Sequence, residues 1–203
     1  MDTIQQVAIG AGLAWASGIR LYAVVFFAGL LAHFNVIQLP SGLHLLTHPV
    51  VLTVSGALFL LEFFADKIPG FDSVWDAIHT FIRIPAGAIL AAATFADVNP
   101  AWMVAAGLAG GTIASGAHLT KAGTRAMINT SPEPFSNWIA SFGEELTVVG
   151  GIWTMFLHPL AFLVILAVFL GFAAWLIPKF WRATRSLVGR LGRPRLASRE
   201  APD

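Results

Sequence analysis

Ionisable side chains concentrate in one short stretch of an otherwise apolar chain. This stretch, EFFADKIPGFDSVWDAIHTFIRIPAG, spans residues 62–87 and lies between two long apolar segments. Its candidate functional residues are Glu62, Asp66, Asp72, Asp76, His79 and Arg83. Carboxylates bind protons and cations, a histidine titrates near neutral pH, and arginine binds carboxylates or other anionic groups. The residue types therefore favour ion binding, proton transfer or recognition of an anionic group.

The spacing within this stretch is helical. Asp72, Asp76, His79 and Arg83 follow one another at steps of four, three and four residues, which puts them on one face of a helix. Because a proline within a helix disrupts the backbone ladder, Pro85 predicts a kink beside Arg83. Glu62 and Asp66, four residues apart in the preceding segment, also share a helix face.

Four more candidates lie outside this stretch: Arg20, His118, Glu144 and Glu145. An isolated charge at the centre of a bilayer costs roughly 2.5–3.5 kcal/mol on insertion scales. We therefore expect these groups to converge, either on one another or around a water-filled cavity open to the cytoplasm. In a purely structural interpretation, ion pairs hold the helices together and Asp66 and Asp72 are ordinary interfacial residues.

The composition indicates an integral membrane protein. The chain has 203 residues, of which 57% are hydrophobic and 11% charged, whereas soluble domains are about one quarter charged. We predict an all-α transmembrane bundle over residues 1–178, followed by a basic cytoplasmic tail over 179–203. Cysteine is absent, which excludes disulfides and thiolate ligands. No sequence pattern indicates nucleic-acid binding, a phosphate-binding loop or a catalytic serine.

The apolar segments predict about six spans. They cover residues 4–34, 46–66, 74–97, 101–124, 137–157 and 159–178 and are separated by proline, asparagine and glycine. The three expected outer connections contain no Lys or Arg, whereas the C-terminal tail is basic. With an even number of spans, the positive-inside rule therefore predicts that both termini are cytoplasmic.

The first segment is too long for a simple span. Its 31 residues would form a helix of about 46 Å, against a hydrocarbon core of about 30 Å. It is therefore a tilted helix, a broken helix or a re-entrant hairpin, and Ser17–Gly18 is the expected break. Ala-Ser-Gly occurs at 16–18 and again at 114–116. This pair suggests an inverted repeat of three plus three spans, a plan used by many secondary transporters.

One known family shares the most distinctive stretches. LEFFADKIPGFDSVWD at 61–76, Arg83-x-Pro85-x-Gly87, and SPEPFSN at 131–137 followed by Glu144-Glu145 resemble a bacterial membrane-protein family catalogued as domain of unknown function 4126. The resemblance covers roughly residues 5–178. It implies an integral protein of the bacterial inner membrane, and it transfers no activity, substrate or site residues.

The favoured function is a small proton- or ion-coupled transporter, expected to be a homodimer, with a polar cavity facing the cytoplasm. Arg20, Arg83 and His118 would bind an anionic solute or lipid phosphate. Protons or a cation would be handled by Asp76, His79 and Glu144. Membrane lipids are the expected surroundings, and transport requires no cofactor.

Two alternatives remain open. In the first, the chain is a membrane-embedded enzyme acting on lipid phosphate headgroups, with a divalent cation such as Mg²⁺ held by Asp72, Asp76 and Glu62 or Asp66. In the second, it is a non-catalytic scaffold whose charges are fully paired. A bound divalent ion would favour the enzyme, and the absence of a solvent-filled cavity would favour the scaffold.

Overall fold

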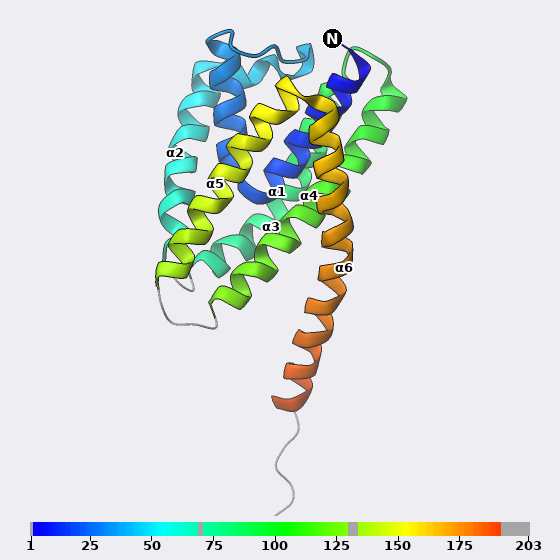
Figure 1. Ribbon diagram of the computed structural model, residues 1–203. Coiled ribbons are helices and arrows are strands. Elements are labelled where there is room, and N and C mark those ends of the chain that lie inside the picture. Colours follow the sequence, from blue (N-terminus) through cyan, green and yellow to red (C-terminus); the bar gives the residue numbers. More distant parts are fainter. Residues whose placement is uncertain (1, 69–70, 130–133, 192–203) are drawn as a thin grey trace, which may run out of the picture.

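The computed structural model describes residues 2–68, 71–129 and 134–191, and throughout these ranges the regular elements are helical (Figure 1). In chain order they are α1 (Thr3–His33), the short 3₁₀ helix η1 (Ser41–Thr47), α2 (Pro49–Ala65), α3 (Phe71–Thr94), α4 (Pro100–Ile128), α5 (Pro134–Leu157) and α6 (Pro159–Leu191). Each apolar segment of the sequence therefore forms a helix close to its expected position.

Prolines and polar caps explain where the helices begin. Pro49, Pro100 and Pro159 each occupy the first position of a helix, where the missing N–H breaks no hydrogen bond. The Asn99 side chain accepts a hydrogen bond of 2.8 Å from the Ala101 N–H, and so caps α4. These local signals account for the accuracy of the predicted boundaries.

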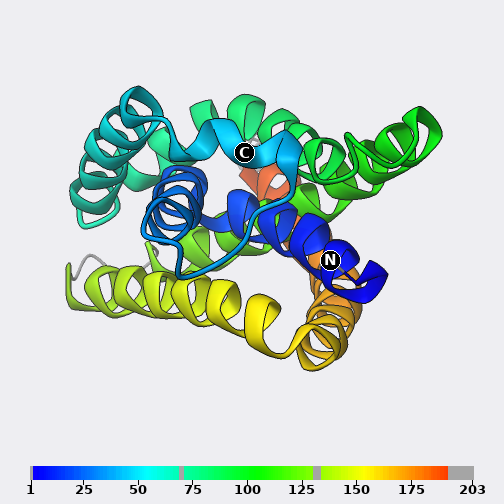
Figure 2. The same cartoon turned by 90° about the horizontal axis from the view of Figure 1, so that it is seen from above.

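Helix α1 folds back on itself at Arg20. The backbone of Arg20 is non-helical, with φ −146° and ψ 85°. Gln6, before the break, donates to the Thr94 carbonyl at the end of α3, and Gly29, after it, packs against Leu46 of η1. Both arms of α1 therefore reach the same end of the bundle (Figures 1 and 2), and the break at Arg20 is the apex between them.

The re-entrant form is thus the one that the structure shows, but the break expected at Ser17–Gly18 was misplaced. Gly18 serves close packing instead. A Cβ atom at Gly18 would lie 2.4 Å from the Ala114 carbonyl oxygen, which brings α1 against α4. The two Ala-Ser-Gly segments meet at this crossing. However, α4 is one continuous helix whereas α1 folds back, so the inverted repeat is not confirmed.

The distribution of polarity is that of a membrane protein. Arg20 and Arg83 are 0% exposed, whereas Phe81 is 82% and Leu146 is 75% exposed. Charges inside and large apolar side chains outside suit a lipid environment and not water. Within the described ranges, three helical stretches (Thr3–His33, Val74–Thr94 and Pro159–Arg182) are long and apolar enough to cross a membrane, or four when the bent pair of η1 and α2 counts as one. Thr3–His33 qualifies by length and composition alone, because it folds back at Arg20. Six spans are therefore not confirmed.

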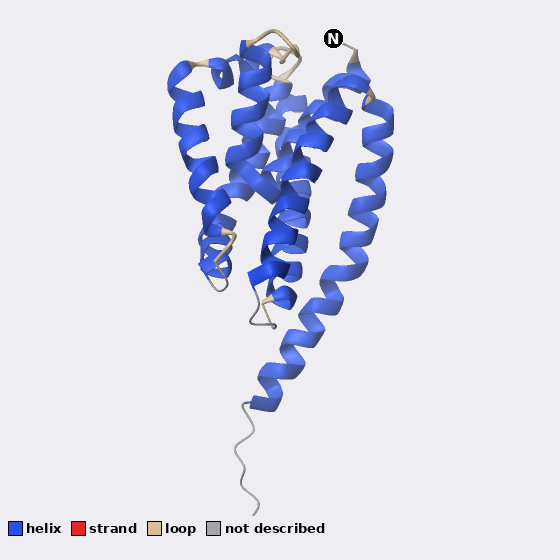
Figure 3. Cartoon of the chain, turned by 60° about the vertical axis from the view of Figure 1, so that its left-hand side comes forward, coloured by secondary structure: helices blue, strands red, loops and turns tan. Residues whose placement is uncertain are grey.

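The expected placement of both termini on one side of a membrane is not confirmed by this arrangement. The beginning of α1 and the end of α6 lie at opposite ends of the bundle, not on one side (Figures 1 and 3). The reason is the fold-back of α1, which returns the chain to its starting side before α2. Helix α6 also runs past residue 178, the predicted end of the bundle, to Leu191, so the basic tail begins as a continuation of this helix.

Candidate functional site

Arg83 joins three helices near the end of the bundle that contains the α2–α3 connection. From α3, its Nη2 donates to Glu62 Oε1 of α2, and its Nη1 donates to Asp76 Oδ1 at 2.7 Å. The same Nη1 lies 3.4 Å from His118 Nδ1 of α4. Helical spacing puts Asp76, His79 and Arg83 on one face of α3, and all three are buried there.

Asp66 is shared by cations from two helices. Its Oδ2 lies 2.8 Å from Arg20 Nη2, 3.1 Å from Lys121 Nζ and 3.7 Å from Arg125 Nη2. Asp66 follows the last residue of α2 and is 0% exposed. Burial alone would raise the pKa of its carboxyl, but Lys121, Arg20 and Arg125 outweigh burial and lower the pKa below its ordinary value. Asp66 is therefore ionised at neutral pH.

Glu144 and Glu145 bring α5 to the same cluster. Arg125 Nε donates to Glu144 Oε1 at 2.8 Å, and Lys121 Nζ lies 3.2 Å from Glu144 Oε2. At the apex of α1, Arg20 Nη2 donates to Ser141 Oγ at 2.7 Å, and Arg20 Nη1 lies 3.6 Å from Glu145 Oε1.

Lys121 links these groups to one another. Its Nζ lies within 3.4 Å of Asp66, Asp76 and Glu144, and donates to the Ile19 carbonyl beside the break in α1 at 3.2 Å. The Lys121 ammonium therefore connects α2, α3 and α5, through their carboxylates, to the break in α1.

The hydrogen bonds assign the tautomer of each buried histidine. His79 Nδ1 lies 2.7 Å from the Trp75 carbonyl, which only accepts, so Nδ1 carries the hydrogen and Nε2 accepts from the Tyr22 hydroxyl at 3.1 Å. His118 Nδ1 faces the Arg83 guanidinium, which only donates. Nδ1 is therefore unprotonated, and His118 Nε2 donates to Thr80 Oγ1 at 2.6 Å.

The network is not fully satisfied. Among the described residues, ion pairs join five carboxylates (Glu62, Asp66, Asp76, Glu144 and Glu145) to four cations (Arg20, Arg83, Lys121 and Arg125), and Lys67, which interacts electrostatically with Glu145 and Asp66, is a fifth cation nearby. Among the described side chains, several buried atoms of this cluster have no hydrogen-bond partner: Arg20 Nε, Arg83 Nε, Glu62 Oε2, Asp66 Oδ1 and Asp76 Oδ2. Unsatisfied buried polar atoms are costly, so these atoms mark positions for water, protons or a bound ion.

Nine of the ten residues singled out from the sequence meet in this cluster: Arg20, Glu62, Asp66, Asp76, His79, Arg83, His118, Glu144 and Glu145. The tenth, Asp72, lies in the first turn of α3, and its side chain is outside the described part of the chain. Sequence reasoning missed three participants, Lys121, Arg125 and Tyr22. The first two had a signal, because together with His118 they follow helical steps of three and four.

An all-helical membrane protein with a charged network buried between re-entrant and crossing helices is the class that these features define. More narrowly, the chain belongs to the family described as Domain of unknown function (DUF4126), which it matches over residues 7–179. No curated protein and no solved structure matches the chain.

Proposed function

We propose that this chain is a small ion-coupled membrane transporter, and that its buried charge network binds the coupling ion. The observation that carries this proposal is the interruption of α1 at Arg20, inside the network, with Lys121 donating to the Ile19 carbonyl beside the break. Secondary transporters use interrupted helices to expose backbone groups and charges at their binding sites.

The pairing within the network favours a proton or cation as the bound ion. Arg20, Arg83 and Lys121 each already pair with two or more carboxylates, whereas Glu62 Oε2, Asp66 Oδ1 and Asp76 Oδ2 accept no hydrogen bond from the described residues and could take up a proton. A bound anion would have to displace carboxylates from Arg20 or Arg83. The Tyr22–His79 hydrogen bond adds a second titratable pair at the edge of the network, suited to proton transfer.

The proposed setting is a bacterial inner membrane, with the end of the bundle that holds the network facing the cytoplasm. Lys67 follows α2, Lys121 and Arg125 lie in the last turns of α4, and Lys179 lies in the second half of α6, while the connections after α1, α3 and α5 at the other end carry no Lys or Arg. Transport through this network needs neither six full crossings nor an inverted repeat, because the re-entrant α1 supplies the interrupted helix.

Proton flux into liposomes tests the proposal. Purified protein is reconstituted with a pH-sensitive dye inside, and a pH or potassium gradient is imposed. We expect proton or alkali-cation movement that falls about tenfold or more in Glu62→Gln, the size expected when a buried ionisable partner is lost, and that stays unchanged in the exposed-site control Asp97→Asn. Gel filtration and circular dichroism establish that the variants are folded. Folded wild-type protein that moves neither protons, sodium nor potassium contradicts the proposal.

A structural scaffold is the second candidate, favoured by the dense pairing of Arg83 with Glu62 and Asp76. Under this interpretation Glu62→Gln lowers the unfolding temperature and the wild type moves no ions. The geometry gives less support to the metal-dependent enzyme. Of the carboxylates proposed to hold Mg²⁺, the structure describes Glu62, Asp66 and Asp76, and these contact arginine and lysine instead.

A further inference from the structure

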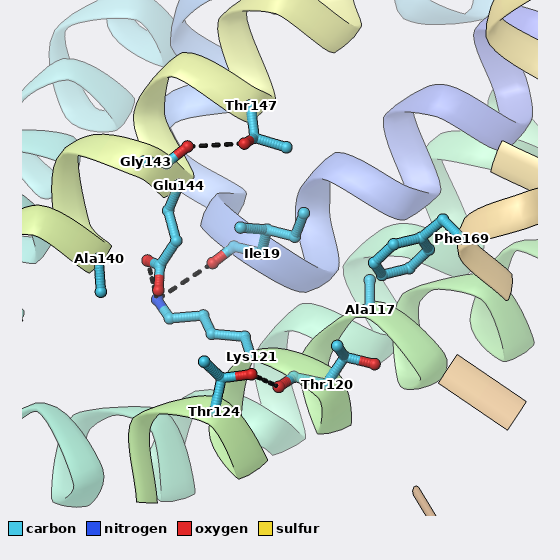
Figure 4. Close-up of a pocket in the computed structure, with 10 residues that line it drawn as sticks. All are labelled: Ile19, Ala117, Thr120, Lys121, Thr124, Ala140, Gly143, Glu144, Thr147 and Phe169. Carbon is cyan, nitrogen blue, oxygen red and sulfur yellow. Dashed lines mark hydrogen bonds and ion pairs between the residues drawn. The ribbon is translucent and has the colours of Figure 1, made fainter. Parts of the chain in front are cut away.

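The cations of the buried network are paired inside the protein. Lys121 is an example, because its ammonium lies 3.2 Å from both Glu144 Oε2 and the Ile19 carbonyl oxygen (Figure 4). A second group of cations lies along α6 and after it. Residues 159–199 contain seven basic side chains and no acidic one, so no ion pair can form within this segment. These cations need partners from elsewhere in the chain or from outside it.

Two basic side chains of this second group, Lys179 and Arg182, are described by the structure, and both are exposed. Lys179 Nζ lies 3.3 Å from the centre of the Trp175 ring, and Arg182 Nε donates to the Pro178 carbonyl at 3.3 Å. The ion pairs among the described residues involve neither side chain. Both cations are therefore available to an anionic partner.

Two tryptophans indicate where this part of α6 lies relative to a membrane. Trp175 and Trp181 are more than half exposed, and they lie near the end of the stretch Pro159–Arg182, which is long and apolar enough to cross a membrane. Exposed tryptophan together with lysine or arginine at the end of a span is typical of the level of the lipid headgroups. Lys179 and Arg182 are therefore at the level of the lipid phosphates.

The helix continues beyond this level. Phe180 lies against Gly123 of α4, but α4 ends at Ile128, and the last turns of α6 extend past the rest of the bundle to Leu191 (Figures 1 and 3). Helical spacing divides the positions of this part between two opposite faces. One face has the basic positions Lys179, Arg182, Arg185 and Arg190, and the other has the apolar positions Phe180, Leu187, Val188 and Leu191.

We propose that residues 175–191 of α6 bind anionic phospholipids at the membrane surface. The basic face holds the phosphate groups, and the apolar face lies among the upper parts of the acyl chains, as in other basic amphipathic helices. Pro178 lacks the N–H of an ordinary helical residue, so α6 can bend there and lay its last turns along the surface.

The two faces together select this partner. A soluble polyanion would neutralise the basic face and leave the apolar face in water. A membrane of neutral lipid would cover the apolar face and leave the cations without counter-charges. An anionic lipid surface satisfies both faces, and it is next to this part of α6 because the preceding residues form a candidate span.

Quenching of a dye on α6 measures which lipid surrounds it. The chain has no cysteine, so Leu187→Cys in the full-length protein carries a single dye, and Asp97→Cys, at the other end of the bundle, carries the same dye as a control. The protein is reconstituted in vesicles in which phosphatidylcholine is the major lipid and phosphatidylglycerol the minor one. A nitroxide that quenches the dye is attached near the top of an acyl chain of either lipid.

We expect phosphatidylglycerol to be enriched about fivefold or more around the dye at position 187, since each basic residue near the surface contributes about this factor. No enrichment is expected around the dye at position 97. Raising the salt from about 0.1 M to about 1 M shortens the Debye length from about 10 Å to about 3 Å and should remove most of the enrichment.

A matched pair of variants tests the charges. The first variant combines Lys179→Gln, Arg182→Gln, Arg185→Gln and Arg190→Gln, and the second exchanges lysine and arginine at the same four positions. We expect the first to lose the enrichment and the second to keep it. Gel filtration and circular dichroism establish that both are folded.

Equal quenching by the two lipids at position 187, or enrichment that survives the glutamine substitutions, overturns the proposal. Energy transfer between dyes on different chains, with no quenching by either lipid, would mean that a second copy of the chain covers this face and would also overturn it. Ion flux plays no part in these measurements, so lipid binding and the proposed transport are tested independently.

Discussion

Arg20 Nη2 lies 2.8 Å from Asp66 Oδ2, and this ion pair fastens the apex of the re-entrant α1 to the end of α2. Both side chains are completely buried, and Asp66 also contacts Lys121. A single carboxylate therefore holds together segments that are far apart in the sequence.

Replacing Asp66 should destabilise the protein strongly. Asp66→Ala leaves Arg20, Lys121 and Arg125 short of a shared buried partner, and breaking such a pair typically costs about 3–5 kcal/mol. Unfolding in detergent, followed by circular dichroism, measures the loss. Asp97→Asn, at an exposed position, is the control and should change stability little. A wild-type unfolding midpoint for Asp66→Ala would contradict the described network.

The stabilising effect of Asp66 should disappear in acid. Because folding lowers its pKa below the ordinary value of 3.8, its contribution is fully present above about that pH and is lost as the pH falls through the lower, folded value. The difference in unfolding temperature between wild type and Asp66→Asn should therefore be constant near neutrality and narrow below about pH 4. A constant difference down to pH 2 would argue against this linkage.

The two Ala-Ser-Gly segments should respond oppositely to added methyl groups. Gly18→Ala places Cβ 2.4 Å from the Ala114 carbonyl oxygen, so it forces α1 and α4 apart, and we expect a loss of about 1–3 kcal/mol. At Gly116 the nearest atom is Leu170 Cδ2 at 3.7 Å, an ordinary contact. Gly116→Ala should be neutral or stabilising by up to about 1 kcal/mol. Equal effects in thermal unfolding would contradict the described crossing.

The re-entrant form of α1 can be tested by cysteine labelling, since the chain has no cysteine of its own. Single cysteines replace Thr3, Asp97 and Lys179, and a membrane-impermeant maleimide is added to one side of sealed vesicles. We expect Thr3→Cys and Asp97→Cys to react from one side and Lys179→Cys from the other. Reaction of Thr3→Cys and Lys179→Cys from the same side would instead mean that α1 crosses the membrane.

The tautomer assigned to His79 predicts a signal in ¹⁵N NMR. With Nδ1 protonated and Nε2 accepting from Tyr22, the two ring nitrogens should show the shifts of the Nδ1–H form. Tyr22→Phe removes the donor and should shift the Nε2 resonance while costing only about 0.5–1.5 kcal/mol of stability. An unchanged Nε2 resonance would show that Tyr22 is not its partner.

Local signals in the sequence were sufficient to predict the helix boundaries. Pro49, Pro100 and Pro159 restrict the backbone around themselves, so their effect is visible without knowledge of the fold. The stripe of Asp76, His79 and Arg83 was predictable for the same reason, because helical periodicity is a local property. The contact between this stripe and Glu62 could be predicted because exposing a charge to lipid costs much free energy.

Features that depend on contacts between helices were harder to predict from the sequence. The break at Arg20 is set by its partners Asp66 and Ser141, which belong to other helices, whereas Ser17–Gly18 offered a local signal for flexibility that packing overrode. Lys121 and Arg125 were not among the candidate residues chosen from the sequence. Only the spatial arrangement shows that both are buried among carboxylates.

The site of the bend in α1 also constrains the order of assembly during synthesis. Helix α1, which is made before the other helices described, carries an arginine whose hydrogen-bond partner, Ser141, lies 121 residues further along the chain. Until that later segment is inserted, the guanidinium lacks its final surroundings, and a membrane interior opposes leaving it alone there. Helix α1 is therefore among the last of the described helices to reach its native shape, and truncations that end before α5 should leave it at the membrane surface.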